Sequence, residues 1–322
     1  MYKAGDKGNG VLEFQKKLYD IGYDITADGR FGDTTVSILK NYQSKNNLTQ
    51  SGNYDKGTET SIKSKKDIRN YDTDLHEKAG TLESRIRSYL GSGINRIGFI
   101  YYDLTTGEKI SINGNKICTA ASTYKVGMNM VAYNWVRENR LSLSEGLSYK
   151  SIYYEEGTGI LQGQINTTLK NPVSVQKLLD YSIIYSDNIA TKMIQARLGG
   201  GQAVRKAVCD MTGITVDTVN NKITPEMEFR LLKNLYENRN DQYNSHLISI
   251  MKQTIFHDRI DKYVPQYLTA HKIGNYGTYV NDVGIVFTDK PYIIVMYADG
   301  ISDSAEKIAH ISKIVYQAQL EN

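Results

Sequence analysis

The sequence predicts two domains: a small helical domain, then a larger α+β domain whose antiparallel sheet is flanked by helices. The chain has 322 residues, which exceeds the usual span of one compact domain. Its first sixty residues contain a degenerate repeat with apolar residues at helical spacing. The remainder follows the order helix, two strands, a long helical block, three strands and a helix. This order would place the first and last helices of the second domain on one face of its sheet.

Each N-terminal repeat unit combines a short helix with a glycine-containing turn. Both helices carry an aromatic residue followed by glutamine, and each turn ends in a threonine able to cap the next helix. The helical faces are Val11, Phe14, Gln15 and Leu18 in the first unit, and Val36, Leu39, Tyr42 and Gln43 in the second. The turns follow at 28–35 and 51–58.

The turn sequence Asp28-Gly29-Arg30-Phe31-Gly32-Asp33-Thr34-Thr35 shows a family resemblance. Together with the repeat it resembles the small three-helix peptidoglycan-binding domain of bacterial wall enzymes, over residues 1–63. The resemblance implies binding of wall glycan or stem peptide. The same residues would equally well serve only to build a helical hairpin, and no ligand contact follows from them. Residues 64–73 are polar, charged and aperiodic, which predicts a linker.

The second domain, 74–322, is expected to contain these elements. A helix is predicted from Asp74 to Leu90, then alternating strands through 97–101 and 110–112, and a helical block from Ser122 to Thr254. Three strands follow at 267–272, 280–288 and 292–298, and a last helix carries Ile308, Ile311 and Val315 on one side. The apolar run 293–296 predicts a strand buried on both faces.

A serine and a lysine at helical spacing are the first candidates for catalysis. Ser122-Thr123-Tyr124-Lys125 is an S-x-x-K tetrad, but four others begin at Ser37, Ser174, Ser249 and Ser304. The chemistry needs a serine on the first turn of a buried helix, where backbone N–H groups favour developing negative charge. Only Ser122 precedes such a helix, and Lys125 lies one turn along the same face. A serine that merely caps a core helix is the alternative for Ser122 considered alone.

Two later motifs complete an ordered triple. Ser186-Asp187-Asn188 is the only S-D-N in the chain and lies between two helical patterns. His271-Lys272-Ile273-Gly274 opens the first of the late strands. Serine-lysine, serine-x-asparagine and lysine-x-glycine in this order resemble the β-lactamase and penicillin-binding-protein family of serine hydrolases. Flanking matches lie at 157–162, 224–227 and 281–284, so the resemblance covers the chain from about Leu75 onward.

The resemblance implies a role for each matching residue. Ser122 attacks a carbonyl to form an acyl-enzyme, and Lys125 takes its proton. Ser186 relays a proton to the leaving nitrogen, and Asn188 holds the substrate amide and orients the lysines. Lys272 adds a second positive charge that helps to lower the pKa of its neighbour and receives the substrate carboxylate. The remaining members are placed at the substrate: Ile273, Gly274, and Asn275, whose backbone N–H joins that of Ser122 in an oxyanion hole.

Two departures from the family pattern bear on the substrate. Ile273 stands where a hydroxyl normally binds the substrate carboxylate, which predicts weak carboxylate recognition. The loop before Thr224 contains no glutamate to activate a deacylating water, and Asp217 is a poor substitute because it is shorter. An acyl-enzyme formed from a β-lactam should therefore persist. Glu155 and Glu156 are expected to be solvated loop acids or to stand at the cleft mouth.

Composition excludes several other classes. A formal charge of +4, with basic residues scattered among acidic ones, argues against nucleic acid as a partner. No run approaches the length of a membrane helix, and the first residues show no signal peptide in this chain. Two cysteines exclude a disulfide scaffold, although a single Cys118–Cys209 bridge stays open. The histidines show no ligand spacing, so we expect no metal and no cofactor.

The leading hypothesis is a secreted, wall-associated serine hydrolase that acts on peptidoglycan stem peptide or a related amide or ester. The N-terminal domain would tether it to peptidoglycan, and β-lactam-like or acyl-peptide molecules would be its small ligands. One alternative is a wall-binding sensor whose altered lysine-strand motif has lost catalysis. A second is a class A-like β-lactamase with weak deacylation.

Overall fold

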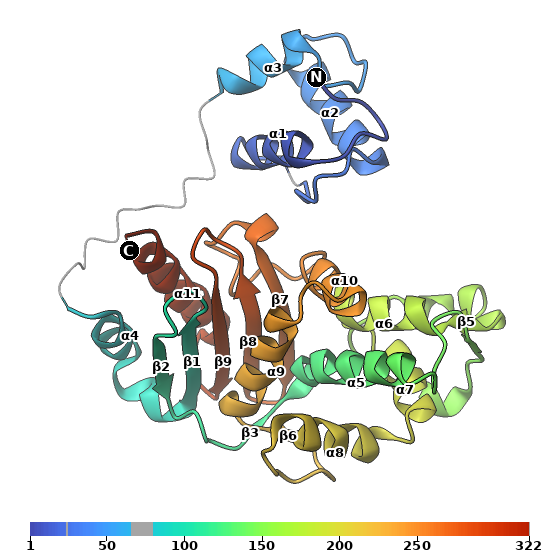
Figure 1. The fold of residues 1–322 in the computed structure, drawn as a ribbon, viewed down its shortest axis with the longest axis vertical. Helices are drawn as coiled ribbons and strands as arrows, with labels where there is room; N and C mark the ends of the chain where they lie inside the picture. The colour runs from blue at the N-terminus through green and yellow to red at the C-terminus, as the bar shows by residue number, and fades with distance from the viewer. Residues whose placement is uncertain (24, 66–79, 322) are drawn as a thin grey trace. The chain divides into compact units, whose positions relative to one another are not determined.

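The computed structural model of the chain describes residues 1–23, 25–65 and 80–321 and divides it into two compact units, Met1–His76 and Glu77–Asn322 (Figure 1). From residue 66 on, the predicted linker lies outside the described residues, as do residues 74–79 of the helix predicted from Asp74. Within the described part of the chain, no helix is both long and apolar enough to cross a membrane.

The N-terminal unit confirms the predicted three helices. They are α1 Asn9–Asp20, α2 Asp33–Lys45 and α3 Lys56–Lys63. The predicted repeat faces are buried except for the half-buried Val36, with Leu18 and Leu39 fully inaccessible to solvent. A ring stack between Phe14 and Phe31, with centroids 5.6 Å apart, joins the first helix to the turn that follows it.

The first repeated glutamine is buried and holds its own glycine turn. Oε1 of Gln15 accepts a hydrogen bond from the Gly29 N–H at 2.8 Å. Its Nε2 donates to the Arg30 carbonyl at 3.0 Å and to Oγ1 of Thr35 at 3.1 Å. The amide therefore satisfies backbone groups that the turn would otherwise bury unpaired.

The second glutamine repeats this arrangement. Gln43 accepts from the Gly52 N–H at 2.9 Å and donates to the Asn53 carbonyl and Oγ1 of Thr58, each at 3.0 Å. The predicted threonine caps are wrong, because each threonine faces its glutamine instead. Gly32 caps α2 without a side-chain bond, and Asp55 caps α3 by accepting from the Thr58 N–H.

The second unit is built on a five-stranded antiparallel sheet of order β2-β1-β9-β8-β7. Its strands are β1 Ile97–Asp103, β2 Lys109–Ile112, β7 Thr269–Tyr276, β8 Tyr279–Val286 and β9 Tyr292–Asp299. Short strand pairs elsewhere are β3 Cys118–Thr119 with β6 Lys222–Ile223, and β4 Gly146–Leu147 with β5 Val173–Ser174. The first two and last three strands of the domain thus form one sheet, with β7 at its edge.

Helices cover both faces of this sheet. The helices are α4 Leu82–Leu90, α5 Lys125–Arg137, α6 Val175–Ile184, α7 Asn188–Arg197, α8 Gly201–Thr212, α9 Pro225–Glu237, α10 Gln242–Met251 and α11 Ser304–Glu321. The first and last of them share one hydrophobic core with Ile294 and Met296 of β9, whereas Ile293 and Val295 face the core of the helical block (Figure 1). The sheet is thus sandwiched, and its β9 strand is buried on both faces as predicted.

Two element positions differ from the prediction, and the open question of a disulfide is resolved. The helix α4 begins at Leu82, where Thr81 caps it, so the predicted start is too early for the described residues. The lysine motif lies inside β7 rather than at its beginning, because the strand already starts at Thr269. Cys118 and Cys209 are both buried free thiols.

Candidate active site

Ser122 lies in a tight turn that continues directly into α5. The turn is a 3₁₀ helix, Ala121–Tyr124, rather than the first turn of an α-helix, and Lys125 is the first residue of α5. Ala121 has φ 51°, a left-handed conformation that a non-glycine residue keeps only when its surroundings enforce it. The buried Asn281 of β8 helps to enforce this conformation, since its Nδ2 donates to the Thr119 and Ala120 carbonyls at 2.9 and 3.2 Å.

The two predicted lysines meet at the Ser186 hydroxyl. Nζ of Lys125 lies 3.2 Å from Oγ of Ser186 and 2.9 Å from Oδ1 of Asn188, and it also donates to the Ser186 carbonyl at 2.8 Å. Nζ of Lys272 donates to the same hydroxyl at 3.0 Å and to the Ile273 carbonyl at 2.9 Å. Four residues from three distant segments therefore share one hydrogen-bond network.

Both lysines are buried, and burial disfavours their charged forms. Lys125 is 1% exposed and Lys272 is fully inaccessible. Burial lowers the pKa of Lys125 to about 7, against the opposing charges of Asp187 and Glu155. Burial, and then the charge of Lys125, hold the pKa of Lys272 well below its usual range. A lysine that is partly neutral near pH 7 can accept a proton from a hydroxyl.

The S-D-N segment is held by its central aspartate. Asp187 is fully buried and caps α7 by accepting from the Ala190 N–H at 2.8 Å. Its other oxygen accepts from the N–H groups of Ile160 and Leu161 at 2.7 and 2.8 Å. A Cβ on Gly159 would lie 2.4 Å from that oxygen, which explains why this loop needs glycine there. The sequence identified the motif but gave no role to Asp187, because the loop it binds is remote in the chain.

The edge strand β7 passes close to the backbone of Ser122. A Cβ on Gly274 would come within 2.8 Å of the Ala120 carbonyl oxygen and 3.1 Å of the Ser122 nitrogen, so only glycine allows this approach. An edge strand leaves alternate backbone N–H groups outside the sheet. The close approach is what an oxyanion hole formed by the Ser122 and Asn275 N–H groups requires.

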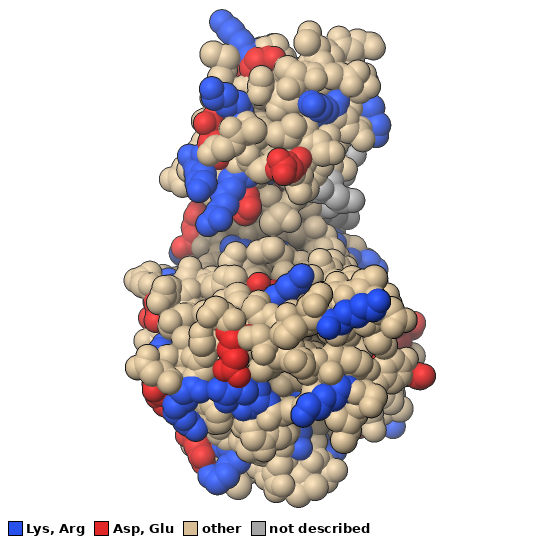
Figure 2. Space-filling view, turned by 90° about the vertical axis from the view of Figure 1, so that its right-hand side faces the viewer, with Lys and Arg blue, Asp and Glu red and all other residues tan. Residues whose placement is uncertain are grey.

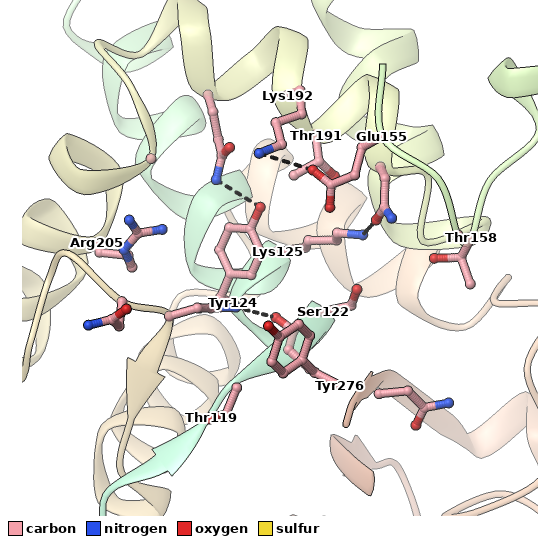
Figure 3. Close-up of a pocket in the computed structure, with 18 of the residues that line it drawn as sticks. Thr119, Ser122, Tyr124, Lys125, Glu155, Thr158, Thr191, Lys192, Arg205 and Tyr276 are labelled. Atoms are coloured by element: carbon pink, nitrogen blue, oxygen red, sulfur yellow. Dashed lines mark hydrogen bonds and ion pairs between the residues drawn. The ribbon is translucent and has the colours of Figure 1, made fainter. Parts of the chain in front are cut away.

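Four of the predicted site residues line a cleft of about 840 Å³, namely Ser122, Lys125, Asn188 and Asn275. The other four, Ser186, Lys272, Ile273 and Gly274, are buried and do not line it. Figure 3 shows Ser122 and Lys125 with Tyr276 in this cleft.

Both acidic residues before Gly157 are exposed loop residues that also line the cleft, so they meet both expectations. The Glu155 carboxylate pairs with Lys192 of α7 at 3.0 Å (Figure 3), and the Glu156 carbonyl accepts from Nδ2 of Asn188 at 3.0 Å. Asp217 is exposed and is held by its own turn, where it accepts from the Val219 N–H. Its loop instead supplies Asn220 and other non-acidic groups to the cleft.

Several cleft residues were not predicted from sequence. Tyr124 (Figure 3) points its hydroxyl toward Gln195, which donates to it at 2.8 Å. Arg205 donates to the Thr218 and Val219 carbonyls. Gln195 and Arg205 come from α7 and α8, which carry no recognisable motif at these positions. The position of Tyr124 inside the S-x-x-K tetrad was the one available signal.

Over the face shown in Figure 2, basic side chains are interspersed with acidic ones.

Solved structures share the fold of the second unit. The protein PBP-A is 23% identical, with a TM-score of 0.68 over 75% of this chain and 96% of its own. A β-lactamase from Sphaerobacter thermophilus DSM 20745 is 20% identical, with a TM-score of 0.65 over 74% of this chain and 98% of its own. Among these relatives, a PBP-A variant is known as an acyl-enzyme complex with penicillin G, with a TM-score of 0.67, 23% identity, and coverage of 75% of this chain and 97% of its own.

A curated protein matches a shorter stretch. The carboxy-terminal processing protease CtpA of Bacillus subtilis (strain 168) is 30% identical over 87 residues, which are 26% of this chain and 19% of CtpA. The chain thus spans about a fifth of the length of that relative, and the activity of CtpA does not carry over.

Family models account for both units. The putative peptidoglycan binding domain matches residues 7–62, and the beta-lactamase enzyme family matches residues 81–319. The second match extends over most of the chain and over every predicted site residue. Its agreement with the fold and the lysine–serine network leads to one conclusion: the chain belongs to the β-lactamase family of active-site-serine hydrolases and carries a peptidoglycan-binding-type domain before its catalytic domain.

Proposed function

We propose that the protein is a secreted, wall-associated hydrolase that cleaves peptidoglycan stem peptide, or a related amide or ester, through an acyl-enzyme on Ser122. One observation carries this proposal: the Ser186 hydroxyl lies within 3.2 Å of both Lys125 and Lys272, beside the cleft that Ser122 lines. This network supplies a base, a proton relay and positive charge in a site largely shielded from water.

The proposed reaction has two steps. Neutral Lys125 accepts the Ser122 proton as the Ser122 oxygen attacks the substrate carbonyl, and the N–H groups of Ser122 and Asn275 stabilise the oxyanion. The proton passes from Lys125 through Ser186 to the leaving amine, whose bond to the carbonyl carbon breaks. Water then attacks the acyl-enzyme, which releases the acid and restores the Ser122 hydroxyl. Each oxyanion donor is worth about 3 kcal/mol in other enzymes.

The proposed substrate class rests on the residues that line the cleft and on the N-terminal domain. Asp217 bonds to its own turn, and the cleft wall from the same loop is formed by Asn220, Asn221 and Lys222. This loop therefore offers no carboxylate base to a water that would deacylate a β-lactam acyl-enzyme. The peptidoglycan-binding-type domain supports a wall substrate, because tethering raises the local substrate concentration.

Digestion of purified peptidoglycan tests the proposal. We expect mass spectrometry of the products to show stem peptides shortened by D-alanine with the native chain, and unchanged stem peptides with Ser122→Ala. A fluorescent penicillin should add covalently to Ser122 in the native chain only. Unmodified Ser122 after long exposure to several acylating probes would overturn the acyl-enzyme step.

A wall-binding sensor is the second candidate, favoured by Ile273 in place of a carboxylate-binding hydroxyl. It predicts retention on insoluble peptidoglycan without any change in stem peptides, so release of D-alanine eliminates it. Rapid, repeated turnover of nitrocefin would instead identify a β-lactamase and contradict the expected slow deacylation.

A further inference from the structure

Behind the lysine strand, two histidines and an aspartate gather outside the catalytic network. His257 and Asp261 lie in the loop between α10 and β7, and His271 is on β7. One side-chain nitrogen or oxygen from each lies within 4.8 Å of the others. Nδ1 of His257 is 2.5 Å from Oδ2 of Asp261, and Nε2 of His271 is 3.2 Å from the same oxygen. This cluster was not predicted, since the spacing of these residues matches no ligand motif.

The fully buried His271 is oriented in the way that metal-binding histidines are. Its Nδ1 faces the Asp282 carboxylate at 2.9 and 3.0 Å, which directs Nε2 toward Asp261. Asp282 is itself fixed by the backbone N–H groups of Ile260 and Val283, each at 3.0 Å. A carboxylate behind the second ring nitrogen is the usual outer-shell support of a histidine ligand, because it fixes the tautomer and the ring orientation.

A buried oxygen in the cluster is left without a hydrogen bond. Among the described residues, Oδ1 of Asp261 has no hydrogen-bond partner, and Nε2 of His271 has only its 3.2 Å ion-pair contact with Oδ2 of Asp261, although the two side chains are 1% and 0% exposed. Buried polar atoms in native proteins are almost always satisfied, so each such atom requires an explanation. The His257 side chain is 35% exposed and gives an ion a path from solvent.

We propose that His257, Asp261 and His271 form a binding site for a divalent transition-metal ion of the zinc type. Two imidazole nitrogens and one carboxylate are a ligand set that zinc accepts, with a fourth position open to water on the His257 side. The bound ion would join the loop at 257–261 to β7, the strand that carries Lys272 and Gly274. Its role would be structural, because these ligands belong to the wall behind the cleft and not to the cleft lining.

Metal titration of tag-free, chelator-treated full-length protein tests the site. We expect calorimetry with zinc to show one site per chain, and cobalt to give the intense visible absorption of four-coordinate Co²⁺. His257→Ala should weaken zinc binding at least about 100-fold, the upper end of what loss of an outer-shell partner costs. Because His257 is partly exposed, the variant should keep its fold, as near-UV circular dichroism will show.

His246→Ala is the matched control. His246 is 38% exposed and bonds to Asp180 at 2.7 Å, so it is a second histidine–aspartate pair away from the cluster. It should leave zinc affinity unchanged. Absence of saturable zinc binding at micromolar concentrations, or equal binding by the native chain and His257→Ala, would overturn the proposal. Activity enters neither outcome, so the test is independent of the proposed hydrolase function.

Discussion

The two units bury polar side chains in opposite ways. In the N-terminal unit, Gln15 and Gln43 are neutral, and their amide groups bond to backbone groups at most 15 residues away. In the catalytic unit, Lys125 and Lys272 are ionisable, and the Ser186 hydroxyl they share is 61 and 86 residues away. The first arrangement completes a fold, whereas the second concentrates charge where water is excluded.

This difference predicts opposite relations between polarity and stability. A buried amide that satisfies a turn stabilises the native state, since its loss leaves backbone groups unpaired. A buried ammonium group destabilises the native state, because its charge is better solvated in the unfolded chain. Replacing a buried glutamine should therefore lower the stability of its unit, whereas replacing a buried lysine should lower the acylation rate.

Lys125→Met should show the largest effect, about a 10³-fold loss of acylation rate, which is typical for loss of a general base. Its stability near pH 7 should be equal or higher, since methionine has similar length and no charge. The folded pKa of about 7 lies below the unfolded 10.5, so the lysine destabilises the fold fully below pH 7 and not at all above about 10.5. The Ser186 carbonyl keeps a partner, because Oγ1 of Thr158 also donates to it at 2.9 Å.

Fluorescent-penicillin labelling and thermal denaturation measure the two properties of Lys125→Met separately. Ser122→Ala is the control for background labelling. A large drop in melting temperature with acylation intact would contradict the prediction that Lys125 is needed for acylation and not for stability.

Gln15→Ala and Gln43→Ala should each destabilise the N-terminal unit by roughly 2–4 kcal/mol, since a glycine N–H and a carbonyl lose their partner. The catalytic unit and its acylation rate should not change. Hydrogen exchange by mass spectrometry can locate the loss of protection within residues 1–65. Gln50→Ala, at an exposed position of the same unit, is the matched control. Loss of protection in the catalytic unit would contradict this prediction.

Local patterns were predictable from sequence, and their spatial meeting was not. The Phe14–Gln15 and Tyr42–Gln43 repeats predicted the first two helices, and the continuous apolar run 293–296 predicted a doubly buried strand. Element boundaries were less certain, as the start of α4 at Leu82 shows, because apolar spacing does not identify the residue that caps a helix. The threonine caps failed because a buried glutamine competes for the same hydroxyl groups.

The candidate catalytic groups were predicted from motif order, which carries no distances. The shared Ser186 hydroxyl, the role of Asp187 and the close approach of Gly274 all depend on contacts between segments remote in the chain. The His271 cluster lay beyond prediction for the same reason. Its aspartate and histidines come from a loop and a strand that only the fold brings together.

The pH profile of acylation should rise about tenfold per unit below pH 7 and level off above it, since only neutral Lys125 accepts the serine proton. Asp187 and Glu155 both favour its charged form. Glu155→Gln should therefore move the inflection to lower pH, whereas Glu156→Gln, at the neighbouring cleft position, should not. Stopped-flow acylation by a chromogenic β-lactam from pH 5 to 9 would measure both inflections. A profile that falls with pH in this range would exclude Lys125 as the base.

The smallest expected effect is that of Ile273→Thr, which tests whether one missing hydroxyl limits the recognition of a substrate carboxylate. Ile273→Thr should raise the acylation efficiency for carboxylate-bearing substrates about tenfold, the value of one hydrogen bond of about 1.4 kcal/mol. Because Ile273 is 5% exposed, the smaller side chain also leaves a space that could change binding by itself. Ile273→Val controls for this, since valine has the shape of threonine without the hydroxyl. A gain in the threonine variant alone would assign the effect to carboxylate recognition, whereas equal gains in both would show that isoleucine limits the cleft by its size.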